Sequence, residues 1–123
     1  MNIYLIISGV IIVITASLHS YLGEKLIFTP LFKQSLPKLL GSSGIMKRTL
    51  RFAWHLTTAA FFGISVILFV LATFQESDMN SIIIKIISVT LFVCMLISLI
   101  IAKGHHFSWI MFLAASFLAW IGS

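Results

Sequence analysis

The sequence predicts an all-α integral membrane protein, a bundle of four antiparallel transmembrane helices with a short interfacial helical segment after the first span. Three observations lead to this fold class. The chain of 123 residues is 60% hydrophobic and only 9% charged, whereas soluble domains carry roughly a quarter charged residues. Its apolar runs are continuous instead of alternating, which favours helices over a transmembrane barrel. Short polar breaks separate these runs.

A membrane span needs about 20 apolar residues. The predicted spans of this single domain, residues 1–123, are 3–22, 52–74, 82–102 and 107–121. The first lacks preceding basic residues and a following small-residue cleavage pattern, so we expect a retained helix and not a signal peptide. The fourth span is short, but Trp109 and Trp120 flank it as interfacial anchors.

The segment 25–40, after the first span, is too apolar to be a simple water-exposed loop. Pro30 and Pro37 fit helix starts, and the glycine- and serine-rich stretch 41–44 then breaks the pattern. We expect one or two short helices in the headgroup layer, with their lysines toward water. The alternative is a cover that packs over the helix ends and seals a pocket there.

Basic residues gather on one side of the predicted membrane, whereas Glu76 and Asp78 lie on the other side with Lys85 nearby. By the positive-inside rule, the basic side is cytoplasmic and both termini face outward, in a bacterial inner membrane. The net charge of +5 then reflects membrane orientation, and nucleic-acid binding is not expected. The basic side carries Lys25, Lys33, Lys38, Lys47, Arg48, Arg51 and Lys103.

All four histidines fall at breaks on this same side. His19 lies near the end of the first span and His55 near the start of the second, while His105 and His106 open the fourth. Together with Glu24 they predict a site for a divalent metal, zinc or iron, because imidazole and carboxylate groups suit such ions. Glu24 would be a ligand or would fix a histidine tautomer. Only one of the two adjacent histidines can point inward.

A haem is the alternative cofactor, because two facing histidines can hold its iron axially. His19 and His55 are the natural pair for this role. Arg51, Trp54 and Trp109 are the candidates to contact a cofactor. Arg51 could instead pair with a lipid headgroup or with the nearby acid, and the tryptophans could serve as interfacial anchors.

Other interpretations of the histidines stay open. Interfacial histidines can bind lipid headgroups in a non-enzymatic accessory subunit or small transporter, and their charge switches near physiological pH, which would suit a proton-linked role. A multidrug exporter is disfavoured, because no acid lies mid-span. Small residues would permit close helix approach within the chain, in a homo-oligomer or in a larger membrane complex. They are Gly9, Ala16, Gly63, Ala114 and Ala115.

Residues 19–24, 51–55 and 106–109 resemble the signatures H-S-x-L-G-E, R-x-x-W-H and H-x-S-W of small four-span bacterial membrane proteins. The resemblance covers nearly the whole chain, and no activity is established for that group. It favours His106 over His105 as the inward residue. It implies that five residues belong together: His19, Glu24, Arg51, His55 and His106.

Overall fold

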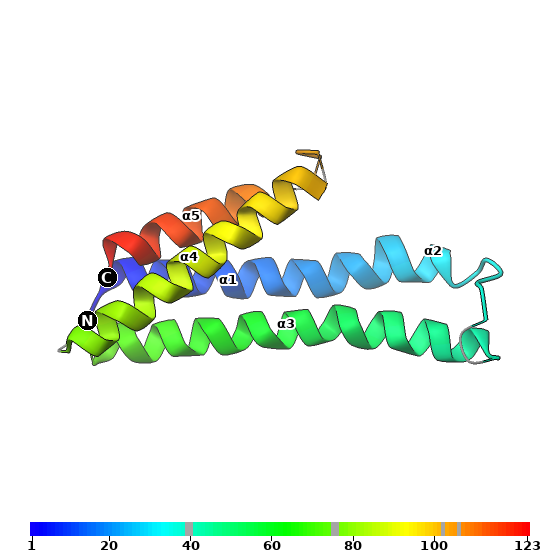
Figure 1. Ribbon diagram of the computed structural model, residues 1–123, viewed down its shortest axis with the longest axis horizontal. Helices are drawn as coiled ribbons and strands as arrows, with labels where there is room; N and C mark the ends of the chain where they lie inside the picture. The colour runs from blue at the N-terminus through cyan, green and yellow to red at the C-terminus, as the bar shows by residue number, and fades with distance from the viewer. Residues whose placement is uncertain (39–40, 75–76, 102, 106) are drawn as a thin grey trace.

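The computed structural model describes residues 1–38, 41–74, 77–101, 103–105 and 107–123. The predicted all-α bundle is confirmed, with four main helices that alternate in direction along the chain (Figure 1). They are α1 (Ile3–Leu22), α3 (Ser43–Thr73), α4 (Asp78–Ile101) and α5 (Ser108–Ile121). Three helical stretches are each long and apolar enough to cross a membrane: residues Ile3–Leu31, α3 and α4. The 14 residues of α5 span only about 21 Å.

The helix bounds match the predicted first span and differ most at the second. Residues 52–74 were expected to form that span, but α3 begins at Ser43. The Ser42 hydroxyl accepts the Gly44 N–H at 3.2 Å and caps this earlier start. The third span, predicted at 82–102, corresponds to α4, and the fourth, at 107–121, to α5. The helical turns ahead of residue 52 are polar and basic, so a pattern based on hydropathy misses them.

The short helical segment expected after the first span is present, but it prolongs α1 instead of forming a separate helix. A π-helical turn, η1 (Gly23–Phe28), follows Leu22, and α2 (Thr29–Leu31) completes the stretch. The Glu24 carbonyl accepts both the backbone N–H and, at 2.7 Å, the hydroxyl of Thr29. Regular helix ends at Leu31, and residues 39–40 of the predicted segment 25–40 lie outside the described residues.

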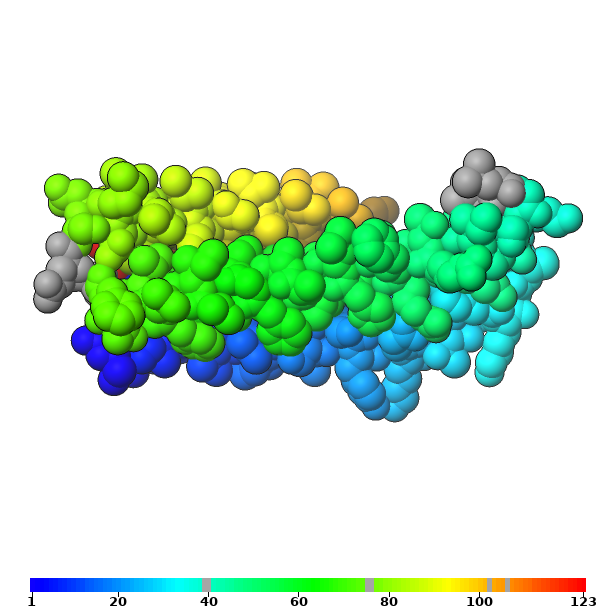
Figure 2. Space-filling model, turned by 90° about the horizontal axis from the view of Figure 1, so that it is seen from below, coloured from blue at the N-terminus to red at the C-terminus, as the bar shows by residue number. Residues whose placement is uncertain are grey.

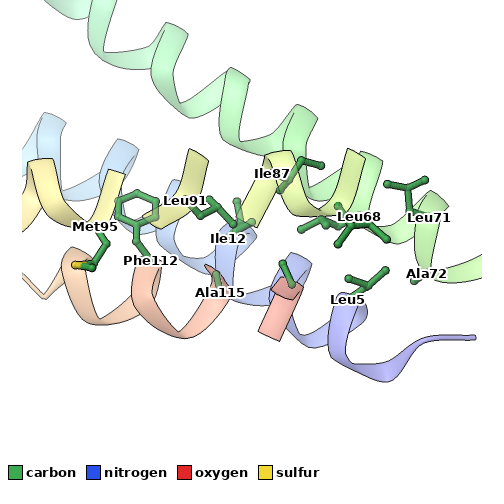
Figure 3. Packing of buried hydrophobic residues seen from close by; sticks show 12 residues of the cluster. Leu5, Ile12, Leu68, Leu71, Ala72, Ile87, Leu91, Met95, Phe112 and Ala115 are labelled. Carbon is green, nitrogen blue, oxygen red and sulfur yellow. The ribbon is translucent and has the colours of Figure 1, made fainter. Parts of the chain in front are cut away.

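The hydrophobic core lies toward the end of the bundle that holds both chain termini, where α1, α3, α4 and α5 meet (Figure 3). α1 packs extensively against α3 and α5, and α4 packs against α5, whereas α3 and α4 meet only sparsely. Toward the other end, α1 with its extension and α3 continue beyond the α4–α5 hairpin (Figures 1 and 2). Fully buried core residues include Leu5, Ile12, Leu68, Ile84, Leu91 and Ala115.

Buried hydroxyl groups connect the helices within this core. Ser8 donates to the Ala115 carbonyl at 2.8 Å. Ser88 and Ser116 each donate to the other's carbonyl, at 2.8 and 2.9 Å. Such bonds satisfy polar groups that have no access to water, and the small side chains bring the backbones close. They join α5 to α1 on one side and to α4 on the other.

Asn2 ties three helix ends together at the terminal face of the bundle. Its side-chain oxygen accepts the backbone N–H groups of Tyr4 and Leu5 and so caps α1. Its side-chain nitrogen donates to the Gly122 carbonyl at 2.9 Å, after α5. Its backbone N–H donates to the Ala72 carbonyl at 2.8 Å, in the last turn of α3.

Candidate functional site

Glu24, Arg51 and His55 meet where the π-helical extension of α1 lies against α3. The Arg51 guanidinium contacts both oxygens of the carboxylate, with Nε 2.7 Å from Oε1 and Nη2 donating to Oε2 at 3.0 Å. Nε2 of His55 lies 3.0 Å from the same Oε1. Such two-point contacts between arginine and a carboxylate are strong and directional. Both carboxylate oxygens are therefore engaged by α3 side chains.

The other ring nitrogen of His55 is also engaged. Nδ1 of His55 lies 2.9 Å from the Ser20 hydroxyl on α1. In the neutral tautomer that fits both contacts, Nε2–H donates to Glu24 and Nδ1 accepts the Ser20 proton. A metal would need one of these nitrogen lone pairs. While both contacts are in place, His55 has neither nitrogen available as a ligand.

Trp54 locks the same two helices together one residue before His55. Its indole Nε1 donates to the His19 carbonyl at 3.0 Å, and its ring stacks on the His19 imidazole with centroids 4.1 Å apart. Gly23 makes room for it, because a Cβ at that position would lie 2.1 Å from Trp54 Nε1. Residues 19–24 and 51–55 therefore lie against each other across one helix pair.

The π-helical turn η1 determines which residue after Gly23 points toward α3. In a continuous α-helix the next residue on the face would be Ile27, four positions on. In the structure Ile27 is 37% exposed and Phe28 only 3%. The extra residue of the π turn thus rotates Phe28 inward, where its ring meets Trp54 edge-on at 5.4 Å.

Cations surround an aromatic side chain just beyond the Glu24 cluster. Phe32 packs on Phe28 with ring centroids 5.3 Å apart. The Arg51 guanidinium lies 5.2 Å from the centre of the Phe32 ring and the Lys47 ammonium 5.7 Å. Lys47 also donates to the Phe32 carbonyl at 2.8 Å. These contacts pin the chain after α2 to the first turns of α3.

The structure brings together only part of the predicted metal set. Glu24 and His55 meet, and His19 lies beside them through its stacking on Trp54. His105 lies in the connection between α4 and α5, and Figure 1 shows this hairpin bending away from α3 toward that connection. His106 lies outside the described residues. No group of three or more His, Cys, Asp or Glu that could hold a metal ion occurs within the described ranges.

The cofactor contacts are likewise divided. Arg51 and Trp54 belong to the Glu24 cluster, where Arg51 pairs with the acid, one of the roles expected for it. Trp109 is partly buried against the hydrophobic core instead. Zinc, iron and haem stay predictions. The contacts that the structure shows at Glu24 and His55 are hydrogen bonds and an ion pair between two helices.

Sequence reasoning missed four residues that shape the site. Ser20 and Gly23 stand inside the first signature segment, yet serine and glycine are common in membrane helices and carry no signal by themselves. Phe28 and Phe32 read as part of an interfacial segment. Their alignment with Trp54 and Arg51 depends on the π turn, which no local pattern announces.

Ser20, His55 and Glu24 follow the order hydroxyl, imidazole, carboxylate that activates a serine nucleophile. Acyl transfer also needs donors for the developing oxyanion. Ser20 lies in the last turn of α1, and the nearby Gly23 N–H bonds the His19 and Ser20 carbonyls within the helix. The Gly23 N–H is therefore already engaged, and the contacts that the structure shows for Ser20, His55 and Glu24 join α1 and its extension to α3.

Comparison with protein-family models, with curated proteins and with solved structures finds no match. What the protein does is therefore inferred from the charge, depth and contacts of this end of the α1–α3 pair.

Proposed function

We propose that the protein binds the headgroups of anionic phospholipids through the basic end of α1–α3, on the cytoplasmic face of a bacterial inner membrane. We define the basic end as residues 23–51. One observation carries the proposal. The only acid in this stretch, Glu24, is occupied by Arg51 and His55, so it neutralises none of the remaining cations. The stretch has a net charge of +5, from Lys25, Lys33, Lys38, Lys47, Arg48 and Arg51 against Glu24.

The depth of the basic end fits the headgroup layer. At 1.5 Å per residue, Glu24 lies about 32 Å along the helix from Ile3, and Arg51 about 33 Å from Thr73. The hydrocarbon layer is about 30 Å thick, and the membrane with its headgroups about 40–45 Å. With the terminal face of the bundle at one hydrocarbon boundary, the cluster reaches the opposite headgroup layer.

The surface around the cluster is mixed in the manner of a membrane interface. Leu26 and Phe52 are 63% and 67% exposed beside the cationic side chains. The Lys25 ammonium bonds the hydroxyl of the exposed Tyr21 at 3.4 Å. Apolar side chains can enter the acyl boundary while lysine and arginine reach the phosphates. Each such cation contributes about 1 kcal/mol at an anionic surface. The proposal assigns binding to this end, as in an accessory or transport protein, and implies no reaction.

Lipid retention tests the proposal. The protein is reconstituted in bilayers that contain equal amounts of phosphatidylglycerol and phosphatidylcholine, then released and examined by native mass spectrometry. We expect bound phosphatidylglycerol to exceed phosphatidylcholine and the excess to shrink as salt rises. A variant with Lys33, Lys38, Lys47 and Arg48 changed to Gln should lose most of the excess, whereas the control Lys85→Gln, near the start of α4, should keep it. Equal retention of both lipids by the wild type would contradict the proposal.

A further inference from the structure

Three of the six cations at the basic end contact other groups. Lys25 bonds the exposed Tyr21 one turn earlier on its own helical stretch, whereas Lys47 and Arg51 contact residues outside α3. Lys47 and Arg51 lie one turn apart on α3, and both face the ring of Phe32. The Phe32 carbonyl fixes the Lys47 ammonium at 2.8 Å, and the Glu24 carboxylate fixes the Arg51 guanidinium at two points. Within the described ranges, the side chains of Lys33 and Lys38 make no hydrogen bond or ion pair. Lys47 and Arg51 are thus the ordered pair of the group.

Both ordered cations keep donors for a further ligand. Arg51 uses Nε and Nη2 on Glu24, which leaves both Nη1 protons and one on Nη2, because guanidinium has five N–H donors. Lys47 uses one of its three protons on Phe32. Both Glu24 oxygens are already taken, so the carboxylate does not serve Lys47. Like charges four residues apart on a helix repel each other. An anion that bridges them relieves this repulsion.

We propose that Lys47 and Arg51 form a specific binding site for the phosphate of one anionic phospholipid, beside the ring of Phe32. The inference rests on the proposed function and narrows it from a diffuse basic surface to one pair of side chains. Phosphate suits the pair because its several acceptor oxygens can take charge-assisted bonds from both cations. Ordering the two side chains in advance removes part of the entropy cost that a long, free side chain incurs on binding.

The position of Lys47 and Arg51 relative to the membrane favours the phosphate of a lipid over a free phosphate ion. Lys47 lies about 39 Å along α3 from Thr73 and Arg51 about 33 Å, so the two side chains bracket the layer outside a hydrocarbon core of about 30 Å. Phospholipid phosphates occupy this layer at high local concentration. Leu26 and Phe52 are exposed at the same end of the molecule, and their apolar side chains can contact the acyl chains of a lipid, which an inorganic ion lacks.

The test compares two variants that remove the same charge from the same end of the molecule. Lys47→Gln removes one of the ordered pair, and Lys33→Gln removes an exposed lysine outside it. Phosphatidylglycerol is titrated into detergent-solubilised protein, and the bound lipid is counted by native mass spectrometry. We expect Lys47→Gln to weaken binding of the first lipid roughly tenfold, the loss of one charge-assisted bond. Lys33→Gln should change it less than threefold, and Lys47→Arg should retain binding.

The outcomes separate this inference from the broader proposal. If Lys47→Gln and Lys33→Gln weaken binding equally while the wild type still prefers phosphatidylglycerol, the specific pair is wrong and the diffuse basic surface stands. If the wild type shows no preference, the proposed function itself fails. If inorganic phosphate competes at concentrations comparable to those of the lipid, the site binds free phosphate and the lipid assignment is overturned. Thermal unfolding of each variant checks that binding losses do not reflect loss of fold.

Discussion

Gly23 shows how one missing side chain allows the two helices to meet. The Trp54 indole occupies the space in which any other residue would place its Cβ, and from there it reaches the His19 carbonyl and stacks on the His19 ring. The same approach brings Ser20 and Glu24 within reach of the two nitrogens of His55. The absence of a side chain at Gly23 therefore permits both the aromatic and the polar contacts between α1 and α3.

Replacing Gly23 by Ala should separate these contacts. The new Cβ would lie 2.1 Å from Trp54 Nε1, so the indole must move and lose its bond to His19. We expect a loss of about 1–3 kcal/mol in the free energy of unfolding, the usual cost of overpacking, measured by denaturant titration in detergent. Gly63→Ala is the matched control, because no atom lies within 4 Å of its added Cβ. Equal stability of the two variants would show that Trp54 does not need the space at Gly23.

Among the single residues, the sequence predicted part of this cluster. An antiparallel turn between the first two spans places Glu24 and His55 at the same depth, and an arginine near them has few other acids to meet. The hydrogen-bond partner of His55 Nδ1 could not be predicted, because it depends on how α1 is rotated about its own axis. Ser17 and Ser20 both lie near the end of the helix, and only packing decides which one faces His55.

At the scale of elements, the π turn at Gly23–Phe28 is the feature that hydropathy cannot reveal. It changes the helical phase by one residue, so Phe28 and Phe32 face α3 while the rest of α1 keeps its own alignment. The predicted interfacial segment was right in being helical near its start. It was wrong in its separation from the first span, because the polar residues of Gly23–Lys25 read as a break although the helix passes through them.

Deleting one residue tests the phase shift directly. Removal of the exposed Leu26 should convert the π turn into ordinary α-helix, because Phe28 then follows Gly23 by four positions and still reaches Trp54. We expect folded, monodisperse protein by size-exclusion chromatography, with stability near that of the wild type. Removal of the exposed Leu18 is the control, because it turns Ser20, Gly23 and Glu24 away from α3 by about 100°. A variant lacking Leu26 that unfolds as readily as one lacking Leu18 would refute this account of the turn.

As a whole molecule, the protein consists of two antiparallel helix pairs of unequal length. The α1–α3 pair spans the full length of the molecule, and the α4–α5 pair covers the part that holds the termini (Figure 1). The sequence predicted the number and alternation of the helices, because lipid requires long apolar runs. It also predicted a short fourth helix, but it did not predict that helix continues from α1 to Leu31 or that α3 begins at Ser43. Polar helical turns at the start of α3 are stable outside the hydrocarbon and leave no trace in hydropathy.

The charge asymmetry of the whole chain predicts its orientation. In a background with Cys94 changed to Ala, Ser77→Cys marks the connection between α3 and α4, and Lys33→Cys marks the basic end. By the positive-inside rule, a membrane-impermeant maleimide added to intact spheroplasts should label Ser77→Cys at once and Lys33→Cys only after lysis. The reverse pattern would place the basic end outside and would remove the cytoplasmic leaflet as its lipid source.

Asn2 gives the bundle an order of assembly. During synthesis its backbone N–H gains the Ala72 carbonyl only when α3 has entered the membrane, and its side-chain nitrogen gains the Gly122 carbonyl after the chain has grown by 120 residues. By contrast, the contacts of Glu24 and Ser20 with Arg51 and His55 lie within 35 residues of one another and become available much earlier. We therefore expect the end of the α1–α3 pair that holds Asn2 to close later than the basic end, because the partners of Asn2 lie much further along the chain.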